Sequence, residues 1–136
     1  MENEIFHKLK PIFKENGLIL VYLFGSQARG TSFKESDIDI GVLFAQKINQ
    51  NDYLKLEGKL IGIFSESYPS KEINIVNLNI ASPLLKQTVV LEGKLFYKKD
   101  DLSRILFEIR SLREYEEYLH SNNIYQQFFN LKMKAL

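Results

Sequence analysis

The sequence predicts an α/β or α+β protein in which one small mixed β-sheet is flanked by helices. Three observations support this fold class: short apolar runs of strand length, longer segments with helical spacing between them, and Gly, Pro or Ser at the boundaries. The chain has 136 residues, of which 45% are apolar and 26% are charged. This size and composition are typical of one globular domain, so we expect a single domain over residues 1–136.

The first predicted helix covers residues 2–16. Its apolar residues follow helical spacing, and Gly17 stands where a helix commonly ends. Pro11 lies inside the segment, so the sequence favours either a later helix start or a kink. Residues 18–24 (LILVYLF) form a continuous apolar run. Such a run predicts a strand that is buried on both faces.

Residues 37–43 (DIDIGVL) predict a second strand, because polar and apolar residues alternate at its start. Side chains two residues apart share a face of a strand, so Asp37 and Asp39 are expected on one face and the isoleucines on the other. After a polar connector, residues 52–68 predict a helix that Pro69 closes.

A third strand is predicted at residues 72–78 (EINIVNL), with Glu72 and Asn74 on the same face. Ser82 followed by Pro83 is typical of a helix N-cap and the first helical position. We expect that helix to end just before the next glycine.

The remaining chain predicts one short strand and then only helices. The strand is expected at residues 94–97, and a helix at residues 101–120. Asn122 and Asn123 are expected to separate this helix from a last one that reaches about Lys132. We treat the helical C-terminus, about residues 101–134, as a partner-binding extension of the domain.

Aromatic side chains are dense on these C-terminal helices, interleaved with charged residues. We expect most of them to belong to the core, and a partner-binding face is the alternative. The aromatic residues concerned are Tyr115, Tyr118, Tyr125, Phe128 and Phe129.

Composition excludes several classes of protein. The chain has no cysteine, so it has neither a disulfide framework nor a thiolate metal site. No apolar run approaches the roughly 20 residues of a spanning helix, and we expect a cytoplasmic location without a membrane partner. The formal net charge is +1, which argues against direct nucleic-acid binding but not against a nucleotide held through a metal.

The segment GSQARGTSFKESDIDIGV combines a glycine turn with two aspartates. Gly25 permits a tight turn, and Ser26 can cap a helix whose N–H groups face a phosphate. Arg29 either lines the phosphate site or lies on the loop surface. Like charges at Asp37 and Asp39 favour a shared proton, a basic partner or a bound cation. Mg²⁺ is the obvious cation, because carboxylates and substrate phosphates commonly bind it together.

The pattern of Gly25-Ser26, ten intervening residues and Asp37-Ile-Asp39 resembles the signature of the DNA polymerase β-type nucleotidyltransferase superfamily. The form GSQARG...SDIDIGVLF is especially similar to the minimal nucleotidyltransferases (MNT), the antitoxins of HEPN/MNT toxin–antitoxin pairs. The similarity extends over residues 18–97, and more loosely over the helical C-terminus.

This resemblance implies a polymerase β palm-like fold and transfer of AMP from ATP, with Mg²⁺, to a hydroxyl. In the family the acceptor is a tyrosine of the partner HEPN ribonuclease, which is thereby silenced. The resemblance also implies that Gly25 and Ser26 hold the triphosphate, while Asp37 and Asp39 bind metal and act in catalysis. We therefore expect a hetero-oligomer with a HEPN-domain toxin.

The sequence departs from the family at the third carboxylate. The matching segment is INIVNLN, in which Asn74 and Asn77 stand where the family has aspartates. An amide is neutral, a poor metal ligand, and unable to take a proton from an attacking hydroxyl. Glu72 lies two residues before Asn74 on the same strand face and is a candidate replacement.

Three hypotheses about function therefore remain open. The first is an active adenylyltransferase that uses the two aspartates and Glu72. The second is a degenerate nucleotidyltransferase that neutralises its toxin by binding alone. The third is a small-molecule nucleotidyltransferase, although such proteins carry a further substrate domain for which this chain has little room.

Overall fold

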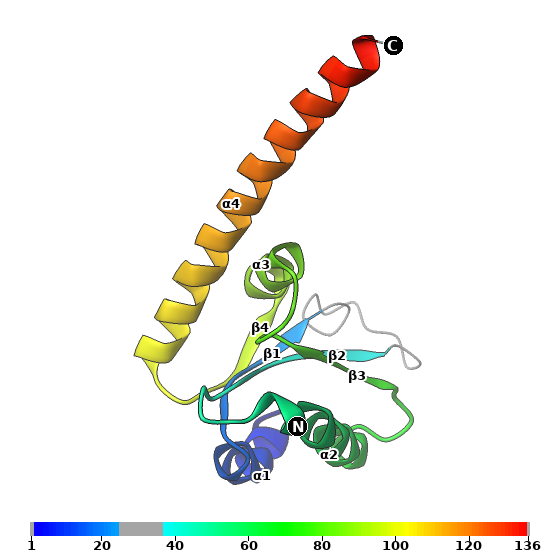
Figure 1. Ribbon diagram of the computed structural model, residues 1–136. Helices are drawn as coiled ribbons and strands as arrows, with labels where there is room; N and C mark the ends of the chain where they lie inside the picture. Colours follow the sequence, from blue (N-terminus) through cyan, green and yellow to red (C-terminus); the bar gives the residue numbers. More distant parts are fainter. Residues whose placement is uncertain (1, 25–36, 136) are drawn as a thin grey trace.

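The structure is a computed structural model, and it describes residues 2–24 and 37–135. Except at the C-terminus and at the short 3₁₀ helix η1, which falls where the sequence predicts a connector, the order of elements agrees with the sequence prediction, with boundaries one or two residues apart. In chain order the elements are α1 (Glu2–Glu15), β1 (Leu18–Phe24), β2 (Ile38–Phe44), the 3₁₀ helix η1 (Gln50–Asp52), α2 (Tyr53–Ser67), β3 (Ile73–Asn77), α3 (Pro83–Glu92), β4 (Lys94–Lys98) and α4 (Asp101–Lys134) (Figure 1).

The strands form one four-stranded sheet in the order β3-β2-β1-β4. Strand β1 is antiparallel to both β2 and β4, whereas β2 and β3 are parallel. A parallel pair needs a crossover connection, and α2 supplies it. The predicted mixed sheet is therefore confirmed.

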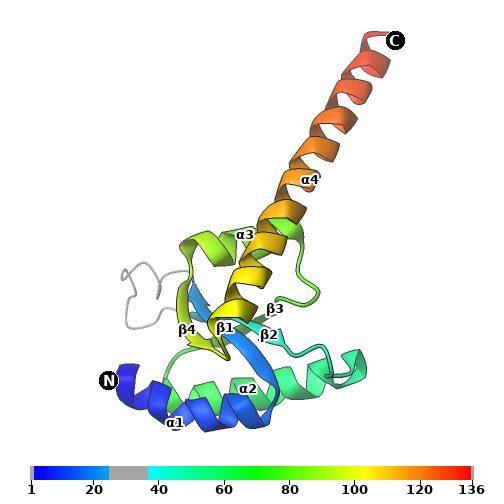
Figure 2. The same ribbon diagram turned by 90° about the vertical axis from the view of Figure 1, so that its left-hand side faces the viewer.

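Helices cover both faces of the sheet: α1 and α2 lie on one face, and α3 and α4 on the other (Figure 2). Ile38, Ile40 and Val42 of β2 belong to the core beneath α1 and α2. The alternate residues of β2 consequently face α3 and α4. The core on that second face is formed by Leu20, Tyr22, Leu78, Val89 and Phe107.

Helix α1 begins at Glu2, as the predicted range has it, and continues through Pro11, so the alternative of a later start is wrong. Leu9 and Phe13, on either side of the proline, are completely buried. Their burial stabilises the helix enough to offset the hydrogen bond that proline removes. The predicted stop is confirmed, because Gly17 has a φ of 72°, in the left-handed region.

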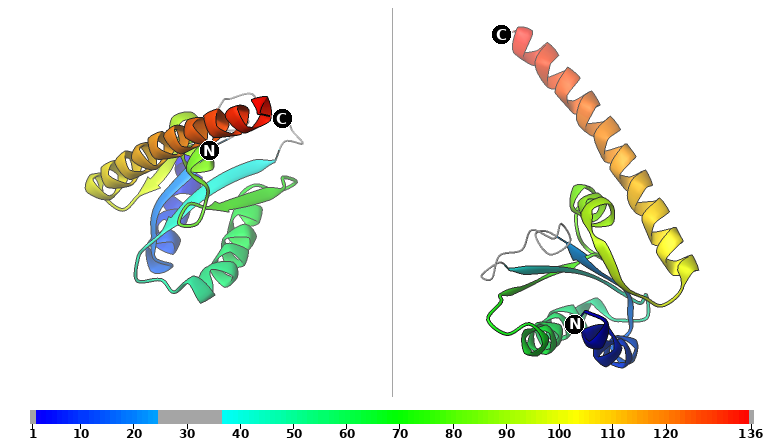
Figure 3. Two further views of the ribbon diagram at one scale, coloured as in Figure 1. Left: turned by 45° about the horizontal axis from the view of Figure 1, so that its top comes forward. Right: turned by 180° about the vertical axis from the view of Figure 1, so that it is seen from behind.

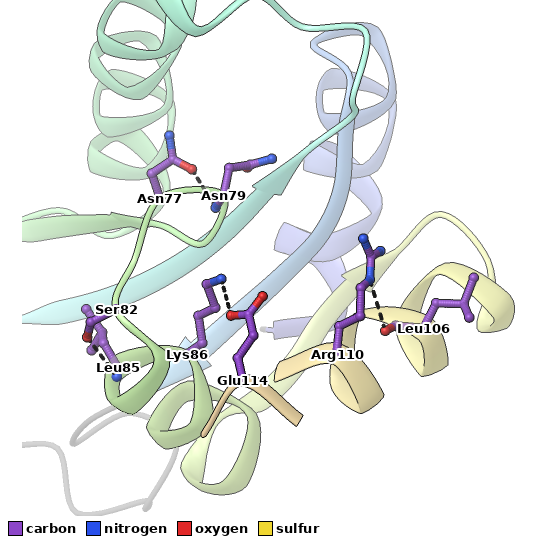
Figure 4. A network of polar contacts seen from close by, with 8 residues as sticks. All are labelled: Asn77, Asn79, Ser82, Leu85, Lys86, Leu106, Arg110 and Glu114. Atoms are coloured by element: carbon purple, nitrogen blue, oxygen red, sulfur yellow. Dashed lines mark hydrogen bonds and ion pairs between the residues drawn. The ribbon is translucent and has the colours of Figure 1, made fainter. Parts of the chain in front are cut away.

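The N-terminus of α3 is capped as the sequence predicts. The Ser82 hydroxyl accepts a hydrogen bond from the backbone N–H of Leu85 at 3.2 Å, and Pro83 opens the helix (Figure 4). At the other end, the N–H of Gly93 donates to the carbonyl of Val89 at 2.8 Å.

Helix α4 is one continuous helix of 34 residues, so the predicted division into two helices is wrong. Asn122 and Asn123 do not end it, because asparagine costs a helix interior at most about 0.7 kcal/mol, and no glycine or proline stands beside them. At about 1.5 Å per residue the helix is about 50 Å long. No helix in the described part of the chain combines the length and apolar character needed to cross a membrane.

Only the first part of α4 packs on the domain. Phe107 and Ser111 are buried against the sheet and α3. The Tyr22 hydroxyl donates to Glu108 Oε1 at 2.8 Å, and Lys86 Nζ contacts Glu114 Oε2 at 2.7 Å. Beyond these contacts every side chain of residues 116–135 is exposed, and this projecting half extends away from the sheet (Figure 3).

The predicted core position of the C-terminal aromatics is therefore wrong for most of them. Tyr115 is half-buried, whereas the side chains of Tyr118, Tyr125, Phe128 and Phe129 are exposed. The physical reason is the continuity of α4: without a turn at the asparagines, the second half of the helix does not fold back to cover the first.

Replacing Tyr22 by phenylalanine should weaken the contact between β1 and α4. Loss of the hydrogen bond to Glu108 is expected to lower the free energy of unfolding by about 0.5–1.5 kcal/mol near neutral pH. Burial, followed by the hydrogen bond to Glu108 and its negative charge, raises the pKa of Tyr22 above its ordinary value of 10.0. The hydroxyl therefore contributes its full stabilisation of the folded state below pH 10. This contribution is lost as the pH rises further, because the unfolded chain releases the proton more readily than the folded protein does.

Denaturant unfolding of both proteins at pH 8 and at pH 11 measures this effect. We expect the deficit of Tyr22→Phe relative to the wild type to shrink at pH 11. A difference in unfolding free energy that is equal at both pH values would contradict a stabilising hydrogen bond from the Tyr22 hydroxyl to Glu108.

Candidate active site

Asp37 and Asp39 lie at the start of β2, on either side of Ile38. Ile38 is completely buried beneath α1 and α2, whereas Asp39 is half-buried and Asp37 is exposed on the opposite face. The buried isoleucines of β2 fix which face of the strand is inside. Both carboxylates, hereafter the carboxylate pair, therefore lie on the face that α3 and α4 share.

Asn74 of β3 completes a group of three side chains at this place. The parallel register pairs Asp39 with Asn74 and Ile38 with Ile73. The Asn74 amide nitrogen donates to Asp39 Oδ1 at 3.2 Å and lies 3.5 Å from Asp37 Oδ2. The structure thus brings one amide to both carboxylates, from positions 35 and 37 residues apart in the chain.

Asn77 is the second residue of the INIVNLN segment that stands where the family has an aspartate, and its surroundings differ from those of Asn74. Asn77 is buried, and the isoleucines two and four residues before it pack towards α1 and α2. Its Oδ1 accepts a hydrogen bond from the backbone N–H of Asn79 at 2.8 Å (Figure 4). Because strand side chains alternate, Asn77 lies on the face opposite the carboxylate pair. Of the two asparagines that stand where the family has aspartates, only Asn74 is at the candidate site.

Glu72 lies directly before β3, and its side chain is exposed. Its carbonyl accepts a hydrogen bond from the N–H of Ile38 at 2.8 Å, so its backbone is beside the start of β2. Among residues 2–24 and 37–135, no three His, Cys, Asp or Glu side chains are grouped so that they could hold a metal ion. A metal-binding or catalytic role for Glu72 stays a prediction.

The other predicted site residues, Gly25, Ser26 and Arg29, lie outside the described residues, and their roles stay predictions. Strand β1, which precedes them, ends at Phe24. The Cα of Phe24 is paired with that of Asp39 in the antiparallel ladder. The end of β1 is therefore next to the carboxylate pair.

Gly41 allows α3 to approach β2 closely, two residues beyond Asp39 on the same face. A Cβ at this position would lie 3.1 Å from Val89 Cγ1 and 3.4 Å from Leu78 Cδ1. The Val89 side chain would have to shift by a few tenths of an ångström to accept it. In the sequence the only sign of this contact is a glycine inside a strand, which often marks the close approach of another segment.

A polar groove of about 500 Å³ lies at the opposite end of β2, near Phe44. Asn79, Lys86 and Glu114 are among its lining residues, and the Lys86–Glu114 ion pair bridges α3 and α4 there (Figure 4). The carboxylate pair does not line it. Sequence reasoning missed this groove, because its residues come from segments whose contact depends on the packing of α4.

Comparison with known families shows that the class of protein is a nucleotidyltransferase. Residues 7–102 match the family model described as polymerase beta, nucleotidyltransferase. This match covers more than half of the chain, so the protein belongs to the polymerase β nucleotidyltransferase family. The fold class and the resemblance seen in the sequence are both confirmed.

Several similar proteins are adenylyltransferases or antitoxins by name. Protein adenylyltransferase MntA of Shewanella oneidensis is 33% identical over 117 residues, covering 85% of this chain and 77% of that protein. A solved structure described as a toxin–antitoxin with AMP-PNP is 29% identical, with a TM-score of 0.67, covering 94% of this chain and 98% of that one. A structure of tri-AMPylated Shewanella oneidensis HEPN toxin in complex with MNT antitoxin is 27% identical, with a TM-score of 0.64, covering 98% and 99%.

Proposed function

We propose that this protein is the antitoxin of a toxin–antitoxin pair and transfers AMP from ATP to a hydroxyl, most simply a tyrosine, of a HEPN-domain toxin. The observation on which this proposal depends is the carboxylate pair on one face of β2, beside the end of β1. The similarity to MntA over 85% of the chain supports the reaction class. The similarity to an antitoxin in complex with an AMPylated HEPN toxin supports the partner.

The residues fit an Mg²⁺ ion bound together with a nucleotide. Both carboxylates lie within 3.5 Å of a single Asn74 nitrogen, so their oxygens converge on one place. Two protein carboxylates with substrate phosphates are a common ligand set for Mg²⁺. Asp37 and Asp39 would hold the ion, which when bound neutralises charge on the phosphates.

In the proposed transfer, the acceptor oxygen forms a bond to the α-phosphorus of ATP. The bond from that phosphorus to the bridging oxygen breaks, and pyrophosphate leaves. The hydroxyl proton must pass to a base, for which Asn74 is unsuitable because its amide does not accept a proton. Glu72 is our candidate, because it is an exposed carboxylate at the adjoining end of β3.

We assign the triphosphate to the segment that follows β1. Gly25 and Ser26 would provide backbone N–H groups and a hydroxyl, and Arg29 a positive charge. The end of β1 beside Asp39 supports this assignment, since phosphates bound after Phe24 would be near the carboxylates that hold the metal.

The projecting half of α4 is the proposed toxin-binding surface. It exposes large apolar and aromatic side chains, including Tyr125 at 65% and Phe128 at 60% exposure. Aromatic residues are enriched among those that dominate binding energies at protein interfaces. Nothing in the described part of this chain covers them. A HEPN toxin is the occupant that the similar complexes favour.

A second candidate function is neutralisation by binding alone. The specific observation that favours it is Asn74, which stands beside Asp39 in the register where the family has its third carboxylate. If no other group can take the proton of the acceptor, the protein would bind its toxin without modifying it.

Mass measurement of a HEPN-domain toxin co-expressed with this protein separates the two candidates. We expect the toxin to gain the mass of one or more AMP groups with the wild type and none with Asp39→Asn. Asp52→Asn, at an exposed position in η1, is the matched control and should behave as the wild type. A toxin that is silenced but unmodified would instead establish binding alone.

A further inference from the structure

Asn74 donates from a single nitrogen towards both members of the carboxylate pair. The distances are 3.2 Å to Asp39 Oδ1 and 3.5 Å to Asp37 Oδ2. Two carboxylates on one strand face repel each other unless a proton, a basic group or a cation stands between them. In this chain an amide N–H group is at that place.

The strand register makes this contact difficult to avoid. Ile38 and Ile73 are paired across the parallel ladder and are both buried on the opposite face of the sheet. A shift of β3 by one residue would exchange its buried and exposed faces. Asn74 is therefore held beside Asp39 by the core and not only by its own hydrogen bonds.

We infer that Asn74 acts as a positioning residue that substitutes for a cation, holding the carboxylate pair together in the metal-free protein. Mg²⁺ must then compete with the amide for the same two oxygens. The protein is consequently expected to bind Mg²⁺ alone weakly and to acquire the ion together with a nucleotide, whose phosphates add ligands. This inference rests on the cation site of the proposed function but not on the toxin or on AMP transfer.

An aspartate at position 74 would reverse this balance. It would add a third negative charge where the amide now donates, so the metal-free protein would lose stability. The same charge would strengthen the attraction for a cation. An alanine would remove the donor without adding a charge, and so would free both carboxylates for Mg²⁺.

Thermal unfolding and calorimetric titration with Mg²⁺, both without nucleotide, test the inference. For Asn74→Asp without metal we expect the melting temperature to fall by about 4 °C, and saturating Mg²⁺ to restore it. The dissociation constant for Mg²⁺ should be at least about tenfold lower than that of the wild type. Asn74→Ala should bind Mg²⁺ at least as tightly as the wild type.

Asn51→Asp is the matched control, because it adds the same charge at an exposed position in η1. Its melting temperature should respond to Mg²⁺ as that of the wild type does. Weaker Mg²⁺ binding by Asn74→Ala would show that the amide is a ligand and would overturn the inference. An unchanged Mg²⁺ affinity of Asn74→Asp would also overturn it.

The proposed function is tested separately, by AMP transfer to the toxin. If the wild type transfers no AMP while the Mg²⁺ measurements agree with expectation, the inference about Asn74 is supported and the proposed adenylyl transfer is wrong. If AMP is transferred but Mg²⁺ affinity does not depend on residue 74, the inference alone fails.

Discussion

Replacing Asp39 by asparagine is expected to reduce AMP transfer to the toxin by more than about 100-fold. Loss of a residue that merely supports a metal ligand costs 10–100-fold, so loss of a ligand itself should cost more. Asparagine has nearly the same volume, and Asp39 is only half-buried, so the fold should be retained. The rate of transfer from labelled ATP to the purified toxin measures the effect.

Two controls make this result specific to the site. Circular dichroism and the melting temperature of Asp39→Asn should show a folded protein, and Asp52→Asn should transfer AMP at the wild-type rate. If Asp39→Asn transfers AMP at the wild-type rate, the carboxylate pair has no part in the reaction and the proposed mechanism is wrong.

Truncation of Tyr125 or Phe129 to alanine should weaken toxin binding by about 30-fold each, the effect expected of a residue that dominates an interface. Both side chains are exposed on the projecting half of α4, so neither change should lower the melting temperature appreciably. Removal of all residues after Asn122 should weaken binding further and leave the domain folded, because that segment is exposed throughout. Titration calorimetry with the toxin gives the affinities.

Gln127→Ala provides the comparison for these variants, since it removes an exposed polar side chain from the same part of the helix. We expect its affinity for the toxin to match that of the wild type. Full affinity in both aromatic variants and in the truncated chain would exclude the projecting half of α4 as the toxin-binding surface.

Local patterns in the sequence predict most of this fold. The apolar run of β1, the Ser82 cap of α3 and the alternation around Ile38 each depend on neighbouring residues, and each is found in the structure. The carboxylate pair could be predicted for the same reason. Its shared face follows from the two-residue period of a strand, whatever the rest of the chain does.

The features that could not be predicted depend on contacts between distant segments. The approach of Asn74 to the aspartates requires β3 to lie parallel to β2 in one particular register, which no local pattern specifies. The continuity of α4 through Asn122 depends on a small difference in helix propensity and on the absence of a covering segment. The close packing at Gly41 likewise depends on Val89, which is far away in the sequence.

The division of α4 into an anchored and an exposed part makes the chain modular. Contacts through Tyr22 and Lys86 join the first part to the catalytic domain, whereas residues 116–135 contribute nothing to its core. Substitutions in the second part can therefore accumulate without a cost in domain stability. If the projecting half binds the toxin as proposed, a helix segment transplanted there from a similar antitoxin should redirect the choice of toxin while the carboxylate pair remains unchanged.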